Sequence, residues 1–138
     1  MTNFIPNPLC NYKFDYAQVF QDIAMGRIDS IDAYRKLILN DLFFVLFFVV
    51  HPFNPGKEAS VNHPFIVQAC KDVEDGPADF TLDLWARFHF KSSIITTAET
   101  IQYVAQNPEL ATGIFSYANK PAKRFLFSIR EICENEKI

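Results

Sequence analysis

The sequence has few glycines and few cysteines, and the cysteine pattern argues against a disulfide-rich or zinc-binding protein. It contains 4 glycines and 3 cysteines among 138 residues. Cys10, Cys70 and Cys133 are odd in number, far apart and without a Cys-x-x-Cys spacing, which argues against a disulfide framework or a zinc site. We therefore expect free thiols. The N-terminus also lacks the basic, apolar and small-residue pattern of a signal peptide, so we predict a cytoplasmic protein.

A membrane-spanning run is missing as well. The most apolar segment is Leu42–Val50, and extending it back to Leu37 gives 14 residues that are interrupted by Asn40 and Asp41. A spanning helix needs about 20 apolar residues. We predict a buried core helix and no membrane span, and the local pattern leaves a strand open because the segment is aromatic and β-branched.

The third missing feature is a surplus of positive charge. Lys and Arg number 13 against 16 acidic residues, so the net charge is −3 and no global basic field indicates a nucleic-acid binder. Four cations at helical spacing near the C-terminus would suit phosphate contacts: Lys120, Lys123, Arg124 and Arg130. Three acidic residues follow directly: Glu131, Glu134 and Glu136. A solvated helix face is therefore the preferred interpretation.

The length is that of one domain, and we treat residues 1–138 as a single domain with a helical part, 1–78, and a second part, 79–138. Capping residues, proline and glycine predict three helices in the helical part. These are a helix over about 15–25 between Asp15 and Gly26, a helix from Asp29 or Ser30 through the aromatic run to a point before Pro52, and a helix from Asn62 or His63 to the break at 74–77.

The second part has a different periodicity. Phe80–Trp85 alternates like a strand, Lys91–Gln106 has helical spacing, Ala111–Ser116 is a short apolar strand pattern, and Asn119–Asn135 is again helical. Strand, helix, strand, helix predicts a βαβα unit. The predicted fold class is therefore α/β: a helical N-terminal subdomain followed by an incomplete P-loop NTPase-like βαβα unit.

A basic loop lies where the first predicted strand meets the next helix. It reads Arg87-Phe-His-Phe-Lys91-Ser92, and Lys-Ser at the start of a helix is the arrangement in which a lysine meets nucleotide phosphates and a hydroxyl binds Mg²⁺. Backbone N–H groups at the helix N-terminus would also point at the anion. The usual glycines are absent, so any left-handed backbone in this loop costs about 1 kcal/mol or more per residue. The bland alternative is an exposed lysine beside serines that cap the helix.

The segment around this loop resembles a known family. Asp83-Leu-Trp-Ala-Arg-Phe-His-Phe-Lys-Ser-Ser-Ile-Ile-Thr96 is similar to the deviant Walker A segment of phage terminase large subunits, the DNA-packaging motor ATPases, where Asp-Leu-Trp-Ala-Arg-x-His-Tyr-Lys-Ser-Thr-Ile-Ile-Thr recurs. Further matches follow in the family's order: Asn62-His-Pro-Phe65, Ile101-Gln102, Asn107-Pro-Glu109, Gly113-Ile-Phe-Ser116, Ala122-Lys-Arg-Phe-Leu126 and Asn135-Glu-Lys-Ile138. The resemblance covers Asp41 to Ile138 and corresponds to the N-terminal portion of a family member.

The resemblance implies a function and a set of site residues. ATP would bind, with Mg²⁺, at Ala86, Arg87, Phe88, His89, Phe90, Lys91, Ser92 and Ser93. Within that loop Lys91 would contact phosphate, Ser92 would be the Mg²⁺ ligand, and Arg87 would sense the γ-phosphate charge. His89 is interpreted as a loop-shaping residue and Trp85 as a packing residue. Phe90 and Ser93 depart from the family's usual Tyr and Thr.

The resemblance also implies partners and shows what this sequence does not contain. Family members package double-stranded DNA into procapsids together with a small terminase subunit and a portal protein, in the cytoplasm of the bacterial host cell. No apolar run ending in the Walker B acids follows Ser116, and the nuclease residues are missing, so ATP turnover by the isolated chain is not expected. Exposed sheet edges would allow self-association. The rival interpretation is a non-enzymatic prophage remnant or small interaction module without nucleotide binding.

Overall fold

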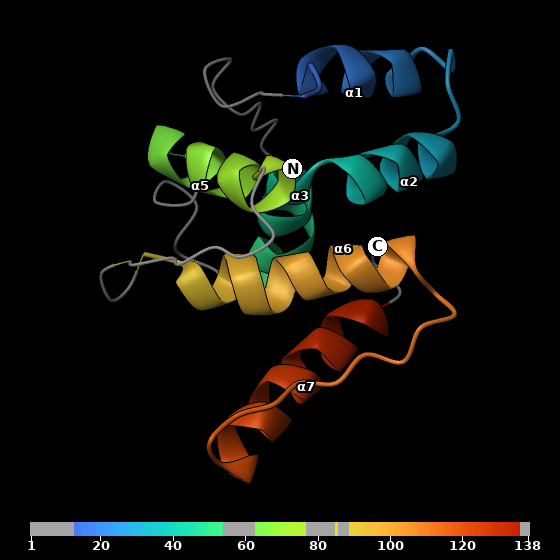
Figure 1. Cartoon of the computed structure of the whole chain (residues 1–138). Helices are drawn as coiled ribbons and strands as arrows, with labels where there is room; N and C mark the ends of the chain where they lie inside the picture. Colours follow the sequence, from blue (N-terminus) through green and yellow to red (C-terminus); the bar gives the residue numbers. More distant parts are fainter. Residues whose placement is uncertain (1–12, 54–62, 77–84, 86–88, 136–138) are drawn as a thin grey trace.

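The computed structural model describes residues 13–53, 63–76, 85 and 89–135, and every regular element in these ranges is a helix (Figure 1). The α-helices are α1 (Tyr16–Ala24), α2 (Ser30–Asn40), α3 (Leu42–Phe44), α5 (Pro64–Asp75), α6 (Glu99–Gln106) and α7 (Asn119–Cys133). Two π-helical segments, η2 (Val45–Val50) and η4 (Ser92–Ala98), and one 3₁₀ turn, η3 (His51–Phe53), complete the set.

The predicted caps of the first two helices are confirmed. The Asp15 carboxylate accepts a hydrogen bond from the Gln18 backbone N–H at 3.1 Å, which satisfies one of the open donors at the start of α1. Asp29 does the same for α2 through the N–H groups of Ile31 and Asp32. After α1 the chain turns at Gly26, whose φ of 67° is a left-handed conformation that glycine adopts without strain.

The third predicted helix is confirmed as α5. The His63 side chain caps it by accepting from the Phe65 N–H at 3.1 Å, and Pro64 occupies the first helical position, where its missing N–H costs nothing. The helix ends at Gly76, and glycine is needed there because a Cβ would lie 2.5 Å from the Asp72 carbonyl oxygen.

The prediction of a single long helix from Asp29 or Ser30 to a point before Pro52 is wrong in one respect. The structure has a break at Asp41, which separates α2 from α3. Asp41 has φ −142° and ψ 100°, an extended conformation that ends α2 and caps the next helix, since its carboxylate accepts from the Phe44 N–H at 2.9 Å. The break lets the aromatic segment leave the direction of α2 and enter the centre of the molecule. A side chain that bonds its own backbone favours this kind of interruption.

The prediction that Leu42–Val50 is a buried helix is confirmed. Phe43 and Val45 are fully buried, and Phe48 is the only residue of the segment that is partly exposed. The segment packs against η4, whose Ile94 and Ala98 are also fully buried. Among the described residues, no helix combines the length and the apolar character needed to cross a membrane.

The helices form tiers around this central segment (Figure 1). α1 covers α2, and α2 and α5 lie on one side of the continuous helix formed by η4 and α6, to which α2 is packed. α7 lies on the opposite side of that helix and contacts η4. The core therefore joins the N-terminal helices to the helix that follows the basic loop.

The predicted α/β fold class, with its βαβα unit, is wrong for the described part of the chain. Ala111–Ser116 is irregular and largely exposed, not a strand, and the helix predicted to follow it is confirmed as α7. The other predicted strand, Phe80–Trp85, lies outside the described residues apart from Trp85, which is not in a strand. A short apolar run becomes a strand only beside a partner strand, and Gly113 weakens it further. The sheet edges expected to support self-association are likewise not found in the ranges described.

Candidate functional site

The basic loop ends where the helix formed by η4 and α6 begins, as the sequence predicts. Lys91 occupies the N-cap position, and Phe90 accepts the first helical hydrogen bond from the Ile94 N–H at 2.9 Å. Lys91 and Ser92 are exposed, while Ser93 is partly buried. Ala86, Arg87 and Phe88 lie outside the described residues. The structure thus places Lys91 and Ser92, the Mg²⁺ ligand that the sequence predicts, at the N-terminal end of a helix of 15 residues, 92–106.

Phe90 has a left-handed backbone conformation, which is costly for any residue other than glycine. Its φ is 61°, and among the described residues other than glycine it is the one with a positive φ. A bulky residue in this region is strained by about 1–3 kcal/mol. The next residue, Lys91, is right-handed, with φ −49° and ψ −53°. A left-handed residue next to a right-handed one turns successive N–H groups toward a common point and forms an anion-binding concavity.

The helix that follows is wound more widely than an α-helix in its first two turns. The Glu99 N–H donates to the Ile94 carbonyl, five residues earlier, and the Thr97 hydroxyl donates to the Ser92 carbonyl at 3.3 Å. Such π-helical turns are rare and occur often at functional sites. The Thr97 contact fixes the backbone of Ser92, which is itself an exposed residue.

Aromatic contacts attach the loop to the helical part of the chain. Phe65, in the first turn of α5, meets Trp85 and His89 edge to face, with ring centroids 6.0 Å and 6.2 Å apart. Trp85 and Phe90 also pack against the buried core. The interpretation of Trp85 as a packing residue is confirmed, and the contact of His89 with Phe65 supports its role in shaping the loop. Aromatic pairs of this kind contribute about 0.5–1.5 kcal/mol beyond burial.

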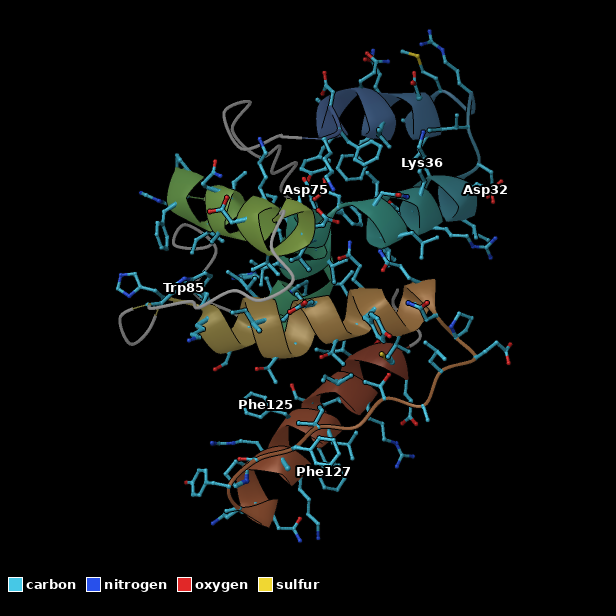
Figure 2. The ribbon with its side chains drawn as sticks, viewed as in Figure 1. Asp32, Lys36, Asp75, Trp85, Phe125 and Phe127 are labelled. Atoms are coloured by element: carbon cyan, nitrogen blue, oxygen red, sulfur yellow. The ribbon has the colours of Figure 1, made fainter. Side chains whose placement is uncertain are left out.

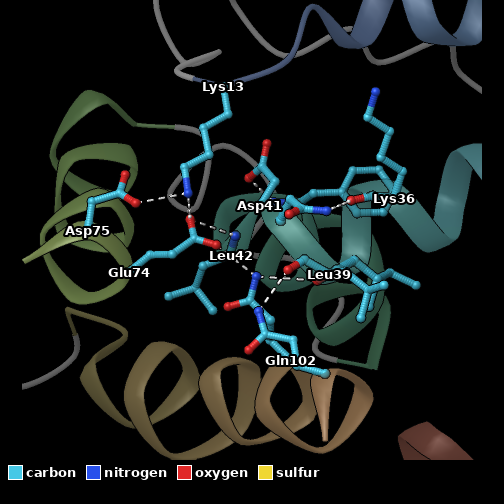
Figure 3. Close-up of polar contacts among 12 residues, drawn as sticks. Lys13, Lys36, Leu39, Asp41, Leu42, Glu74, Asp75 and Gln102 are labelled. Carbon is cyan, nitrogen blue, oxygen red and sulfur yellow. Dashed lines mark hydrogen bonds and ion pairs between the residues drawn. The ribbon is translucent and has the colours of Figure 1, made fainter.

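A buried polar network holds the far end of the same helix (Figure 3). Glu74 of α5 lies at its centre, with a side chain only 11% exposed. It accepts hydrogen bonds from Gln102 Nε2 at 2.8 Å and from the Leu42 N–H at 3.3 Å, and it pairs with Lys13 Nζ at 2.8 Å. One carboxylate therefore connects α3, α5, α6 and the segment before α1.

Two further contacts complete this attachment. Gln102 Nε2 is also 3.3 Å from the Ile38 carbonyl, and Gln106 Nε2 donates to the Leu39 carbonyl at 2.7 Å. These bonds occupy carbonyls at the C-terminal end of α2 that have no partner within their own helix. The helix that bears Lys91 and Ser92 is thus fixed by aromatic contacts at its start and by amide contacts toward its end.

Asp41 lies next to this network and is fully buried. The Tyr16 hydroxyl donates a hydrogen bond to its carboxylate. Burial raises the pKa of Asp41, while the hydrogen bonds from Tyr16 and from the Phe44 N–H act in the opposite direction. Burial is the largest effect, so the pKa of this carboxyl lies above its ordinary value. Asp41 and Tyr16 therefore support the fold by joining the start of α1 to the start of α3.

In the part of the chain that the structure describes, the thiols and the metal-ligating side chains form no second candidate centre. Cys70 and Cys133 are free, and burial raises the pKa of both thiols, which disfavours the reactive thiolate. Within the described ranges, no group of three His, Cys, Asp or Glu side chains is placed to hold a metal ion. The one metal ligand that the sequence predicts is the Ser92 hydroxyl, and a nucleotide's phosphate oxygens would supply the others.

The loop is predictable from the sequence, but the polar groups that hold the far end of its helix are not. The sequence pattern indicates only a helix break at Glu74, and Gln102 falls only within a segment that resembles a family. Both act through contacts between residues that are 28 or more positions apart, which local periodicity does not reveal. A glutamine that falls on the apolar side of a helical pattern was the available signal for Gln102.

Comparisons with protein-family models, with curated proteins and with solved structures found no match for this chain. The likeness to a family therefore consists of the sequence segments themselves.

Proposed function

We propose that residues 86–93 bind Mg-ATP, and that the chain is the nucleotide-binding, N-terminal portion of a DNA-packaging motor of the terminase large-subunit type. The observation that carries the proposal is the left-handed Phe90 directly before Lys91 and Ser92 at the start of a long helix. A strained bulky residue persists where the surrounding structure requires that backbone geometry. Lys91 and Ser92, which are both exposed, follow this residue directly, and this backbone geometry supports a phosphate site at the start of the helix.

The proposal assigns a role to each group of the loop. The N–H groups after Phe90 and the Lys91 ammonium bind the phosphates, and the Ser92 hydroxyl is a ligand of Mg²⁺. Arg87 contacts the γ-phosphate. In a motor of this type the nucleotide would drive double-stranded DNA into a procapsid through a portal protein, with a small terminase subunit, in the bacterial cytoplasm. No carboxylate that would activate water is assigned in residues 1–138, so binding is proposed without turnover.

A thermal-shift titration with Mg-ATP tests the proposal. A ligand that binds only the folded state adds RT ln(1 + [L]/Kd), about 1.4 kcal/mol at roughly tenfold excess over Kd, which raises the melting temperature by several degrees. We expect this rise in the unmodified chain and none in Lys91→Ala, because the lost charge-assisted contact contributes about 1.5–3 kcal/mol. Ser93→Ala should retain most of the shift.

Lys71→Ala is the matched control, because Lys71 is an exposed lysine on α5 and is not among residues 86–93. Mg-ATP should raise the melting temperature of this variant as much as that of the unmodified chain. Equal shifts in Lys91→Ala and the unmodified chain, or no shift in either, would reject a nucleotide site in this loop.

The second candidate is a non-enzymatic interaction protein that keeps terminase-like sequence without nucleotide affinity. Its supporting observation is that the described part of the chain has no sheet beside the loop, and that Phe115 and Tyr117 are almost fully exposed. The same titration separates the two candidates, because only the first requires stabilisation by Mg-ATP.

A further inference from the structure

Charge is distributed unevenly along this acidic chain. Residues 110–130 contain no Asp or Glu, although the whole sequence has 16 acidic residues and a net charge of −3. All four cations of this stretch are on α7: Lys120, Lys123, Arg124 and Arg130. Arg130 is paired with Glu134 at 2.8 Å, and the other three make no ion pair among the described residues. The first half of α7 is therefore a local basic surface on an acidic molecule.

An exposed aromatic ring lies among these cations. Phe127 is 65% exposed and follows Lys123 and Arg124 by four and three positions, so the three side chains share one face of the helix. Phe125, two positions earlier and nearly opposite on the helix, is half-buried (Figure 2). The buried residues of α7, Ile129 and Ile132, lie in its second half. The ring of Phe127 is thus not needed for packing against the rest of the molecule.

The segment that leads into α7 adds two more rings. Tyr117 is 96% exposed and Phe115 is 94% exposed, the highest values among the exposed large apolar side chains of the described part. This segment runs back along α7 to reach its N-terminus, at the end of the helix that projects away from the other helices (Figure 1). The most exposed rings and the acid-free stretch therefore belong to one continuous region.

We propose that this region, the basic-aromatic surface, binds single-stranded nucleic acid, its cations contacting phosphates and its rings stacking on bases. It consists of Phe115, Tyr117, Lys120, Lys123, Arg124 and Phe127. Single strands are the one polyanion whose flat apolar faces are open to stacking, and proteins bind them with basic surfaces that carry aromatic platforms. A duplex hides its base faces and would leave the rings in water. A membrane would require a continuous apolar helix face, whereas the apolar side of α7 is turned inward at Ile129 and Ile132.

Fluorescence anisotropy with labelled oligo-dT and oligo-U, about 16 nucleotides long, tests this on the full chain without ATP. We expect binding of single strands that weakens with salt, and that exceeds binding of a duplex of equal length. Phe115→Ala and Tyr117→Ala should each weaken single-strand binding at least about fivefold, the lower limit for losing one stacked base. The double variant Lys123→Ala with Arg124→Ala should reduce the magnitude of the slope of log affinity against log salt by about 1.4. This is the value that corresponds to the loss of two phosphate contacts with a single strand.

Matched variants separate stacking from folding and from the nucleotide loop. Tyr117→Phe keeps a ring and should bind like the unmodified chain, as should Tyr103→Ala, which removes a ring that is 47% exposed on α6. Lys91→Ala should not change single-strand binding, whatever it does to Mg-ATP. The proposal is overturned if single strands do not bind, if a duplex binds as well, or if Phe115→Ala and Tyr117→Ala bind normally. Co-sedimentation with anionic vesicles in place of single-strand binding would assign the surface to a membrane instead.

Discussion

At the scale of single residues, Phe90 is the position where sequence and conformation disagree most. Glycine would adopt its φ of 61° freely, yet the chain has phenylalanine there, packed against the core. The ring and the loop geometry thus make separate contributions. Burial of the ring stabilises the fold and offsets the backbone strain, while the left-handed conformation shapes the proposed phosphate site.

Two substitutions at this position separate those contributions. Phe90→Val should abolish stabilisation by Mg-ATP, because a β-branched residue is excluded from the left-handed region. Phe90→Gly should keep that stabilisation, measured against its own ligand-free melting temperature, although the lost ring lowers that temperature. If Phe90→Val kept the full Mg-ATP shift, the loop conformation would not matter for binding.

The second residue-scale prediction concerns pH and Asp41. Burial raises the pKa of Asp41 above its ordinary value of 3.8, so the folded state binds a proton more tightly than the unfolded state. The stability contribution of Asp41 is therefore highest in acid and falls as pH rises from about 3.8 through the folded pKa. Urea unfolding of the unmodified chain and of Asp41→Asn, which does not titrate, isolates this effect.

The free energy of unfolding of the unmodified chain minus that of Asp41→Asn should be larger at acid pH than at neutral pH. Each unit of pKa elevation corresponds to about 1.4 kcal/mol. The comparison uses a difference because the other carboxyl groups are the same in both proteins. A difference that rises with pH would mean that the Tyr16 hydrogen bond outweighs burial.

At the scale of elements, a helix boundary is predictable where residues close to it in the sequence cap, begin or end the helix. Asp15, Asp29 and His63 cap helices, and Pro64 and Gly76 bound one, through contacts within a few residues. The break at Asp41 is not predictable locally, because the cost of burying its carboxyl group is offset by a hydrogen bond from Tyr16, 25 positions away. The strand predicted at Ala111–Ser116 failed for the same reason, since an apolar run acquires strand structure only from a distant partner. In the candidate site, Lys91 and Ser92 were found by local motif, and Glu74 and Gln102 were not.

The Glu74 network yields the element-scale prediction. Glu74→Ala should lower the free energy of unfolding by about 2–4 kcal/mol, because it leaves the Leu42 N–H and the Gln102 amide without an acceptor in a mostly buried place. Asp75→Ala is the matched control. Asp75 pairs with the same Lys13 but its side chain is 45% exposed, so its loss should cost under about 1 kcal/mol. Urea denaturation measures both, and equal losses would contradict a special role for Glu74.

At the scale of the whole molecule, stability and exposure are divided between two regions. Leu42–Val50 and Ile94–Ile101 form the centre of the core, and the helices around them are joined by the Glu74 network. The segment 111–118 has almost no buried side chain, and the first half of α7 has none that is fully buried. A chain built in this way unfolds locally at its exposed region long before its core opens.

Hydrogen exchange should display this division directly. Amides in Val45–Val50 and Ile94–Ile101 should exchange most slowly, near the rate set by global unfolding, because their hydrogen bonds lie within the buried helices. Amides of Ala111–Tyr117 should exchange almost as fast as in an unfolded peptide, since that segment is irregular and exposed. Slow exchange there in dilute protein would indicate strand pairing within one chain. Protection that appears only as protein concentration rises would instead identify the segment as the contact between two copies, because only association depends on concentration.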